Sequence, residues 1–383
     1  MLHTLDSFNG NYSGFLRLRE RRVDKIPFLT KDLRTDLLLK EQGGYDGQWY
    51  YYIAFDPFLN RFSAEPQKYH EILDAPPYRL GRIGFPLLTK ILSRDHPPKF
   101  PKTMVLLILG FNLVGAAFFL KILEIYGRSP YWTLLYLLIP STTACLNLGV
   151  PEAMAMAMLL GGLYFYLRGK FALSVLFFSY SLLVRETGVL FLLVLMFLEL
   201  FKERRPKVAL MMASSVVPYL GWKLFLTWRL FGEYGWETLY YSPGDFTFPF
   251  GGVFDLYVTN WSKSSSISGL LFFPALVILN FLFSLVFLRQ RRNIFSLALF
   301  GYCLLHLSLN YHKIWGHIRD LERTMSDGFL FLMLAFFALP SESKPTLRYS
   351  FLAAVVLLLA YKLFYSPIAP SFQAGFNLLR AFR

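Results

Sequence analysis

Long apolar runs occupy most of the chain after residue 103, and short polar connections separate them. The pattern predicts an all-α polytopic membrane protein with about ten spans. A straight crossing of a bilayer needs about 20 residues, so the runs at 171–185 and 187–201 are expected to be tilted or partly re-entrant. The expected spans are 104–126, 131–148, 151–168, 171–185, 187–201, 208–231, 268–288, 294–311, 325–340 and 349–365.

Residues 1–103 contain no run long enough to span a membrane. They predict short helices over 16–22 and 49–58 and an amphipathic helix over 79–94. The apolar face of this last helix, which would lie along the membrane interface, consists of Leu80, Ile83, Leu87, Leu88 and Ile91. The chain therefore divides into a polar region, 1–103, and a transmembrane bundle, 104–383, which contains a long polar loop at 232–267.

Composition supports a membrane protein and argues against a nucleic-acid ligand. The chain is 55% hydrophobic and 17% charged, whereas a soluble domain carries about 25% charged residues. Most of the formal net charge of +14 sits in short loops between apolar runs, where it contacts anionic lipid headgroups. Both cysteines, Cys145 and Cys303, lie inside apolar runs, so neither a disulfide framework nor a thiolate metal site is expected.

The basic residues fall mainly in every second connection between spans. Positively charged loops stay in the cytoplasm, so residues 1–103, the 232–267 loop and the C-terminus are predicted on the outer side. An outer N-terminal region needs a segment that carries it across, and a further span is therefore expected before Met1. The basic connections contain Arg128, Arg168, Lys170, Lys202, Arg204, Arg205, Lys207, Arg289, Arg291, Arg292, Lys344 and Arg348.

The most suggestive polar stretch runs from Gly44 to Tyr52. Asp46 lies between two glycines and is followed by Gln48 and an aromatic run, Trp49 to Tyr52. Glycines let a backbone approach a ligand closely, and Trp and Tyr favour the headgroup zone of a membrane. The stretch therefore predicts a reactive carboxylate at the water–lipid boundary. A turn followed by an interfacial anchor is the alternative interpretation.

The predicted topology collects the remaining charged residues at the outer face, where they would suit an anionic, lipid-linked substrate. Ionisable groups in a membrane cost about 2.5–3.5 kcal/mol each and usually mark function. Simpler explanations stay open: Glu152 would complement a helix start, Arg185 and Glu186 would pair, and Lys223 would snorkel outward. The set comprises Asp46, Asp56, Arg79, Arg82, Glu152, Arg185, Glu186, Lys223, Arg229, Glu237, Asp245, Arg319, Asp320 and Arg323.

With these motifs the chain resembles the GT-C class of integral membrane glycosyltransferases, in a bacterial branch that is distantly similar to the mannosyltransferases of GPI-anchor assembly. The resemblance implies a GT-C-like helical bundle whose large first non-cytoplasmic loop bears amphipathic juxtamembrane helices. It is carried by Gly44–Tyr51, Asp56–Phe58, Tyr78–Ile83 before Pro86–Leu87, Val150–Glu152 and Leu183–Thr187.

The resemblance also implies an activity and a site. It implies transfer of a mannose-like hexose or a pentose from a polyprenyl-phosphate donor to a cell-envelope glycan or lipid acceptor, at the outer face of the cytoplasmic membrane. Asp46 corresponds to the catalytic acid of the first loop, and Arg79, Arg82 and Arg185 fit the basic residues that hold the lipid phosphate. The expected substrate-binding residues are Gln48, Tyr78, Arg79, Arg82, Glu152, Arg185 and Glu186.

Asp46 would act as a general base on the acceptor hydroxyl, and direct displacement would invert the anomeric centre. No metal site and no cofactor are expected, although a divalent cation between Asp46 and the phosphate is left open. Two other functions remain: a transporter or flippase for a lipid-linked sugar, and a non-catalytic factor of envelope glycopolymer assembly.

The topology can be tested with cysteine substitutions at Arg204, Arg291, Asp46 and Glu237. A membrane-impermeant thiol reagent should label the first two positions from the cytoplasmic side and the last two from the outer side, because basic loops stay inside. Labelling of positions 46 and 204 from the same side would contradict the scheme.

Overall fold

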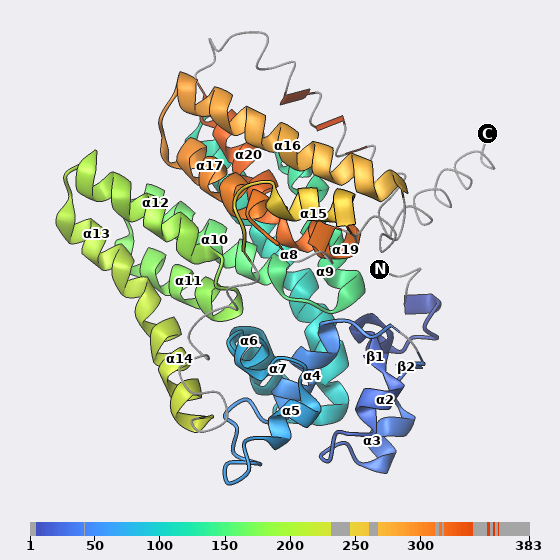
Figure 1. Ribbon diagram of the computed structural model, residues 1–383. Helices are drawn as coiled ribbons and strands as arrows, with labels where there is room; N and C mark the ends of the chain where they lie inside the picture. Colours follow the sequence, from blue (N-terminus) through green and yellow to red (C-terminus); the bar gives the residue numbers. More distant parts are fainter. Residues whose placement is uncertain are drawn as a thin grey trace. The chain divides into compact units, whose positions relative to one another are not determined.

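The computed structural model describes residues 5–41, 43–230, 246–259, 267–310, 314–315, 318–339 and a few positions between 351 and 359. The chain is mostly helical, as the sequence predicts, and it forms two compact units (Figure 1). Unit 1 comprises Met1–Phe118, Cys145–Val189 and Leu210–Tyr241, and unit 2 comprises Phe119–Ala144, Leu190–Ala209 and Ser242–Arg383. The division at residues 103 and 104 rested on polarity and stays a prediction.

Unit 1 opens with short elements in place of a long helix. The predicted helix over 16–22 is confirmed only in its last residues, as α2, because Leu18 pairs in parallel with Leu39 in a small two-stranded sheet. The predicted aromatic helix is confirmed as α4, Gly47–Phe55, and all of its residues are buried. The elements are η1 (Tyr12–Leu16), β1 (Leu18–Arg19), α2 (Glu20–Val23), α3 (Lys31–Thr35), β2 (Leu39–Lys40), α4, α5 (Lys68–Ile72), α6 (Pro76–Leu80), α7 (Gly84–Leu92) and η2 (Pro97–Lys99).

The single amphipathic helix predicted over 79–94 is wrong, since a turn separates α6 from α7. Gly84 explains the break: a Cβ there would lie 2.8 Å from a methyl of Val184, and its carbonyl accepts a hydrogen bond from Tyr180 Oη at 2.9 Å. The expected apolar face is also divided, because Ile83 is buried while Ile91 is 60% exposed. Packing against α11 therefore sets the course of this segment.

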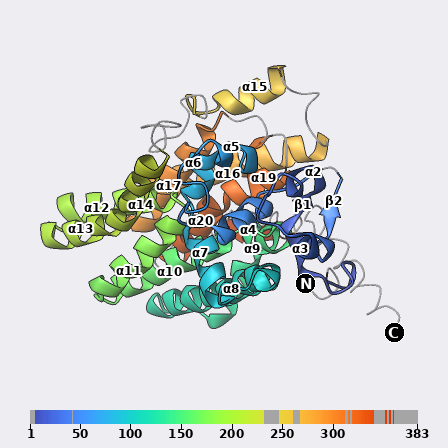
Figure 2. The same ribbon diagram turned by 90° about the horizontal axis from the view of Figure 1, so that it is seen from below.

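Long helices complete unit 1. Helices α10 and α11 lie side by side in Figures 1 and 2, and the contact is close because Gly161 and Gly162 admit the rings of Phe177 and Phe178. Side chains in place of these glycines would collide with both rings. The long helices of this unit are α10 (Glu152–Leu167), α11 (Phe171–Val184), α14 (Val217–Arg229), which follows η4 (Ser214–Val216), and the first part of α8 (Phe100–Ile125).

In unit 2, helices α16, α17 and α20 pack on one another. The single span predicted over 131–148 is wrong as one helix, because a new helix begins at Pro140, which has no backbone N–H to continue the preceding turn. The elements are η3 (Pro130–Leu138), α9 (Pro140–Leu148), α12 (Gly188–Phe201), α13 (Pro206–Ala213), α15 (Gly251–Thr259), α16 (Ile267–Gln290), α17 (Ile294–Leu307), α19 (Ile318–Thr324) and α20 (Ser326–Phe337); α9, α12 and α13 continue across the boundary between the units.

Three of the basic connections meet in unit 2. Arg128 Nε donates to the carbonyl of Phe337 at 2.9 Å, and Arg291 Nη1 donates to that of Ala338 at 3.0 Å. Lys202 Nζ donates to the carbonyl of Arg292 at 3.1 Å. The two arginines satisfy carbonyls at the C-terminus of α20, where positive charge is favourable. The connections predicted to share a compartment are thus neighbours in space.

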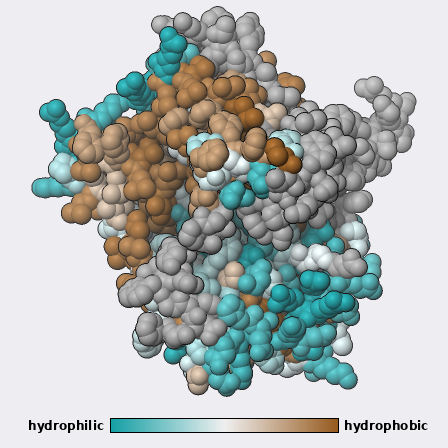
Figure 3. All heavy atoms as spheres, viewed as in Figure 1, coloured by the Kyte–Doolittle hydropathy of each residue, from teal (hydrophilic) through white to brown (hydrophobic). Residues whose placement is uncertain are grey.

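Two helices of the described chain, Pro97–Ile125 and Pro206–Arg229, are long and apolar enough to cross a membrane. Many of their exposed side chains are apolar, with Leu113 73% and Leu210 74% exposed. In Figure 3 the surface over α12 and α13 is hydrophobic, and the surface over α2 and α3 is hydrophilic. The larger number of spans stays a prediction, and the expected span at 349–365 lies mostly outside the described residues.

A substitution of Gly47 would test how tightly the start of α4 is packed. A Cβ at this position would lie 2.5 Å from the carbonyl oxygen of Leu148 and 3.0 Å from that of Leu16. Gly47→Ala should therefore lower the free energy of unfolding by about 1–3 kcal/mol, the usual cost of overpacking. Thermal unfolding in detergent measures the effect. Gly110→Ala on α8 is the control, because nothing lies within 4 Å of its Cβ position; equal melting temperatures for both variants would contradict the prediction.

Candidate functional site

The predicted site residues converge on α6, a short helix that carries two arginines. Pro76 occupies its first position, where a missing N–H costs nothing. Tyr78 is half-buried beside both arginines: the guanidinium carbon of Arg82 lies 4.3 Å from its ring centroid and that of Arg79 lies 5.0 Å away. A guanidinium over an aromatic face is attracted by the ring quadrupole, so Tyr78 holds both arginines in fixed positions.

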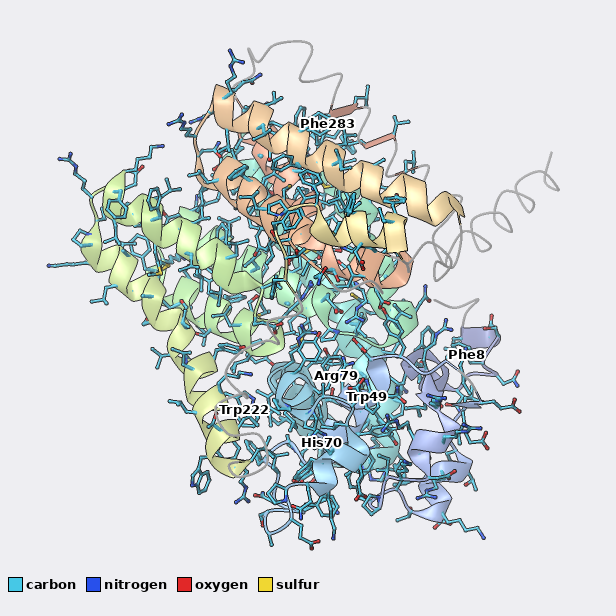
Figure 4. The ribbon with its side chains drawn as sticks, in the orientation of Figure 1. Phe8, Trp49, His70, Arg79, Trp222 and Phe283 are labelled. Atoms are coloured by element: carbon cyan, nitrogen blue, oxygen red, sulfur yellow. The ribbon has the colours of Figure 1, made fainter. Side chains whose placement is uncertain are left out.

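Arg79 binds two carboxylates at once. Its Nε and Nη2 donate to the two oxygens of Asp74 at 2.8 and 3.1 Å, and Nη1 lies 2.9 Å from Asp46 Oδ1. Its guanidinium carbon also lies 5.7 Å from the ring centroid of Trp49, and both residues are labelled in Figure 4. Burial opposes the charge of Arg79, but Asp46 and Asp74 outweigh it and hold the pKa of the guanidinium above its usual value.

Arg82 forms a second bidentate pair, with Glu186. Its Nε donates to Glu186 Oε2 at 3.0 Å and its Nη2 to Oε1 at 2.7 Å. Burial disfavours the carboxylate, but the charge and hydrogen bonds of Arg82 prevail, so the pKa of Glu186 is held below its usual value. This pair joins α6 to the turn between α11 and α12, 104 residues further along the chain.

Asp46 enters the cluster from the N-terminal end of α4. It occupies the residue before the helix, yet its side chain makes no capping hydrogen bond. Its carboxylate is aimed instead at Arg79, with the side chain 20% exposed. The neighbouring Gly47 is needed for the close packing at the start of α4 described above. The structure therefore explains this glycine without a ligand. Asp46 therefore combines partial exposure with a fixed cationic neighbour.

Three other predicted site residues have additional local contacts. Gln48 is buried and accepts a hydrogen bond from the backbone N–H of Arg19 at 3.4 Å, which ties α4 to β1. Glu152 is buried at the start of α10, where Cys145 Sγ lies 3.6 Å from its Oε2. Arg185 is buried beside Glu186. Its charge also lowers the pKa of Glu186, although less than the charge of Arg82 does. Binding roles for these three residues stay predictions.

Sequence reasoning missed Asp74 and left two interpretations of Lys223 open, a member of the charged set or an outward-pointing anchor. Asp74 lies in the loop before α6, where nothing in its neighbours distinguishes it from an ordinary surface acid. The alternative in which Lys223 snorkels outward is wrong, because its side chain is buried and its Nζ lies 3.5 Å from the carbonyl oxygen of Pro77. Next to it on α14, Trp222 Nε1 donates to the carbonyl of Leu80 at 2.8 Å, so α14 packs directly on α6.

Asp56 and Arg229, which the sequence grouped with the site, serve the loop after α4. Asp56 accepts hydrogen bonds from two backbone N–H groups at 2.9 and 3.0 Å and from Tyr69 Oη at 2.6 Å. Arg229 Nη2 donates to Asn60 Oδ1 at 3.0 Å. Glu237, Asp245 and the side chain of Arg319 lie outside the described residues, and Asp320 and Arg323 belong to unit 2.

The cluster brings together basic groups that can bind an anion and acidic groups that can accept a proton. Three cationic side chains, Arg79, Arg82 and Lys223, surround the α6 turn, and the carboxylates Asp46, Asp74 and Glu186 accompany the two arginines. Guanidinium groups bind phosphate bidentately, and a partly exposed carboxylate accepts a proton. Within the described residues no group of three His, Cys, Asp or Glu side chains is arranged to hold a metal ion.

Comparison with known proteins found no match among family models, curated proteins or solved structures.

The Arg82–Glu186 pair should make a large contribution to stability. Arg82→Gln leaves a buried carboxylate without its counter-charge, and the expected loss is about 3–5 kcal/mol of unfolding free energy. Adding Glu186→Gln should restore part of that loss. Because the pKa of Glu186 is lowered by folding, the contribution of the pair is present above the unfolded pKa of about 4.3 and disappears as pH falls through the folded pKa.

Unfolding in detergent as a function of pH measures these effects. Lys68→Gln is the control, because its ion pair with Glu65 is exposed and such pairs contribute about 0–1 kcal/mol. Equal losses for Arg82→Gln and Lys68→Gln would show that the buried pair is no stronger than a surface pair.

Proposed function

We propose that the chain is a GT-C-like integral membrane glycosyltransferase that transfers a sugar from a polyprenyl-phosphate donor to a cell-envelope glycan or lipid acceptor. The observation that carries the proposal is the 2.9 Å contact between Asp46 and Arg79, beside a second buried arginine, Arg82. This reaction needs a group that removes a proton and groups that bind a phosphate, and the cluster supplies both.

The reaction follows from the properties of these groups. The donor phosphate binds Arg79 and Arg82 in competition with their carboxylate partners. The acceptor hydroxyl oxygen forms a bond to the anomeric carbon while the bond from that carbon to the phosphate oxygen breaks. The phosphate leaves with the bonding electron pair, and Asp46 takes the hydroxyl proton. A single displacement of this kind inverts the anomeric centre.

Arg79 has two tasks in this mechanism. In the resting arrangement its charge favours the ionised form of Asp46, the form in which a carboxylate acts as a base. When a phosphate takes over part of its hydrogen-bonding capacity, the hold on Asp46 weakens and the carboxylate becomes available to the acceptor. Donor binding and activation of the base would thus be coupled through one side chain.

Exposed apolar side chains support a location in the cytoplasmic membrane as a multi-pass protein. Leu113 on α8, Leu176 on α11 and Leu224 on α14 are 73%, 62% and 55% exposed. Extended apolar surface of this kind is rare on soluble monomers and suits contact with lipid. In this proposal residues 1–103 and the cluster lie at the outer face, so that an acceptor in the cell envelope reaches Asp46.

A flippase and an assembly factor are the competing functions. A flippase predicts internal repeats and charges near the bilayer midplane, and an assembly factor needs no catalytic carboxylate. A substitution that removes the base and keeps the shape of Asp46 separates both from an enzyme.

Asp46→Asn should leave folding and membrane insertion intact and lower sugar transfer about 10²–10⁴-fold, the usual contribution of a general base. The assay is transfer from a polyprenyl-phosphate sugar to an acceptor by the full chain purified in detergent. Arg79→Ala should mainly raise the donor concentration needed for half-maximal rate, because it removes a charge-assisted contact to phosphate.

Asp24→Asn is the matched control, because Asp24 also faces an arginine, Arg34 at 3.6 Å, and its side chain is 68% exposed. Transfer by Asp46→Asn at the wild-type rate, in a preparation where the wild type is active, would remove Asp46 from catalysis.

A further inference from the structure

Lys223 is a buried cation without a carboxylate partner among the described residues. It is 7% exposed, and the contact that the structure gives its Nζ is a long one, 3.5 Å to the carbonyl oxygen of Pro77. The nearby arginines differ, since each forms a bidentate pair with a carboxylate. A buried ammonium with no carboxylate in direct contact is costly, and the more distant charge of Glu186 is already engaged by Arg82, so the position favours an additional anion.

The surroundings of Lys223 indicate where that anion would bind. Its Nζ faces the turn between α6 and α7, which carries Arg82, and it lies near enough to feel the charges of Glu186 and Arg82. Lys223 and Arg82 therefore border one small region, and Arg79 lies one turn earlier on α6. An anion bound there would contact an ammonium group that is already desolvated. It could do so without displacing a carboxylate.

A ladder of aromatic rings begins beside Lys223 on the same helix. Phe58 lies 6.2 Å from Trp222, Trp222 is stacked 5.0 Å from Phe225, and Phe225 lies 5.9 Å from Trp228, measured between ring centroids. The ladder faces outward at its ends, since Phe58 is 44% and Trp228 69% exposed. Helix α14 thus presents an apolar aromatic surface one residue away from a buried cation.

We propose that α14 forms an amphiphile-binding site in which Lys223 binds the phosphate of a lipid-linked phosphate and the aromatic ladder contacts its hydrocarbon chain. A free phosphate would use only the first of these features, whereas a chain-bearing phosphate uses both. The identification of the ligand with the donor rests on the proposed function; the binding site itself rests on the buried ammonium and the ladder beside it. Lys223 is accordingly a binding residue additional to the two arginines.

The first test compares three probes on the full chain in one detergent: farnesyl phosphate, farnesol and inorganic phosphate. Farnesyl phosphate should bind to the wild type more tightly than either of the others and should raise the melting temperature more than farnesol does, because a ligand that binds only the folded state stabilises it. Equal effects of farnesyl phosphate and farnesol on the wild type would overturn the proposal. This measurement needs no variant.

The second test separates the two features by substitution. Lys223→Met keeps the length of the side chain and removes its charge, so it should weaken farnesyl phosphate and inorganic phosphate binding about tenfold or more and leave farnesol unchanged. Trp228→Ala should weaken farnesyl phosphate binding and leave inorganic phosphate unchanged. Lys68→Met, which removes an exposed lysine of the same unit, is the control for a general loss of charge.

Wild-type affinity for farnesyl phosphate in Lys223→Met would overturn the role of Lys223, and unchanged affinity in Trp228→Ala would leave a site for free phosphate and overturn the lipid assignment. These measurements contain no sugar and no acceptor. If binding of farnesyl phosphate depends on Lys223 but the protein transfers no sugar, the proposed function alone is rejected. If the protein transfers sugar but binding does not depend on Lys223, this inference alone is rejected.

Discussion

The burial of two arginines on α6 is the constraint on which unit 1 depends. A buried guanidinium that loses its counter-charge costs several kcal/mol, so α6 is stable in its position only when carboxylates reach it from other segments. Arg79 is paired with Asp74 of the preceding loop and with Asp46 just before α4, and Arg82 is paired with Glu186 of the turn between α11 and α12. The ion pairs thus connect three regions of the chain that are distant in sequence.

These pairs require close approach of the backbone, and small residues provide it. Gly47 lets the start of α4 meet the carbonyls of Leu16 and Leu148, and Gly84 lets the start of α7 meet α11. Tyr78 then fills the space between the arginines and restricts their rotation. A cluster held in this way is already ordered before a ligand binds, so little conformational entropy is lost on binding. Preorganised charge of this kind is the main source of electrostatic catalysis.

Helix α14 serves two environments at once. One side carries Trp222 and Lys223 against α6, and another carries exposed apolar residues such as Leu220 and Leu224. A helix with these two sides can bring a hydrocarbon chain and a phosphate to the same place without unfolding any part of unit 1. For the proposed transferase, this would join a lipid-dissolved donor to a water-exposed acceptor at one site.

Most of the long helices can be predicted from the amino-acid sequence, because their signals are local. Apolar runs and their polar boundaries predicted α8, α10, α11 and α17 closely, and proline and glycine marked many of the ends. It also singled out Asp46, Arg79, Arg82 and Glu186, since charged residues that flank apolar runs are few.

The pairing of these residues and the positions at which the helices break follow from tertiary contacts. The turn between α6 and α7 depends on the contact of Gly84 with Val184, a hundred residues away, and no local pattern contains that information. Asp74 and Lys223 show the same limit: an acid in a loop looks ordinary in sequence, and only packing decides between an outward-pointing and a buried lysine. Their roles follow from burial and from the charges that packing places beside them, which are properties of the folded chain alone.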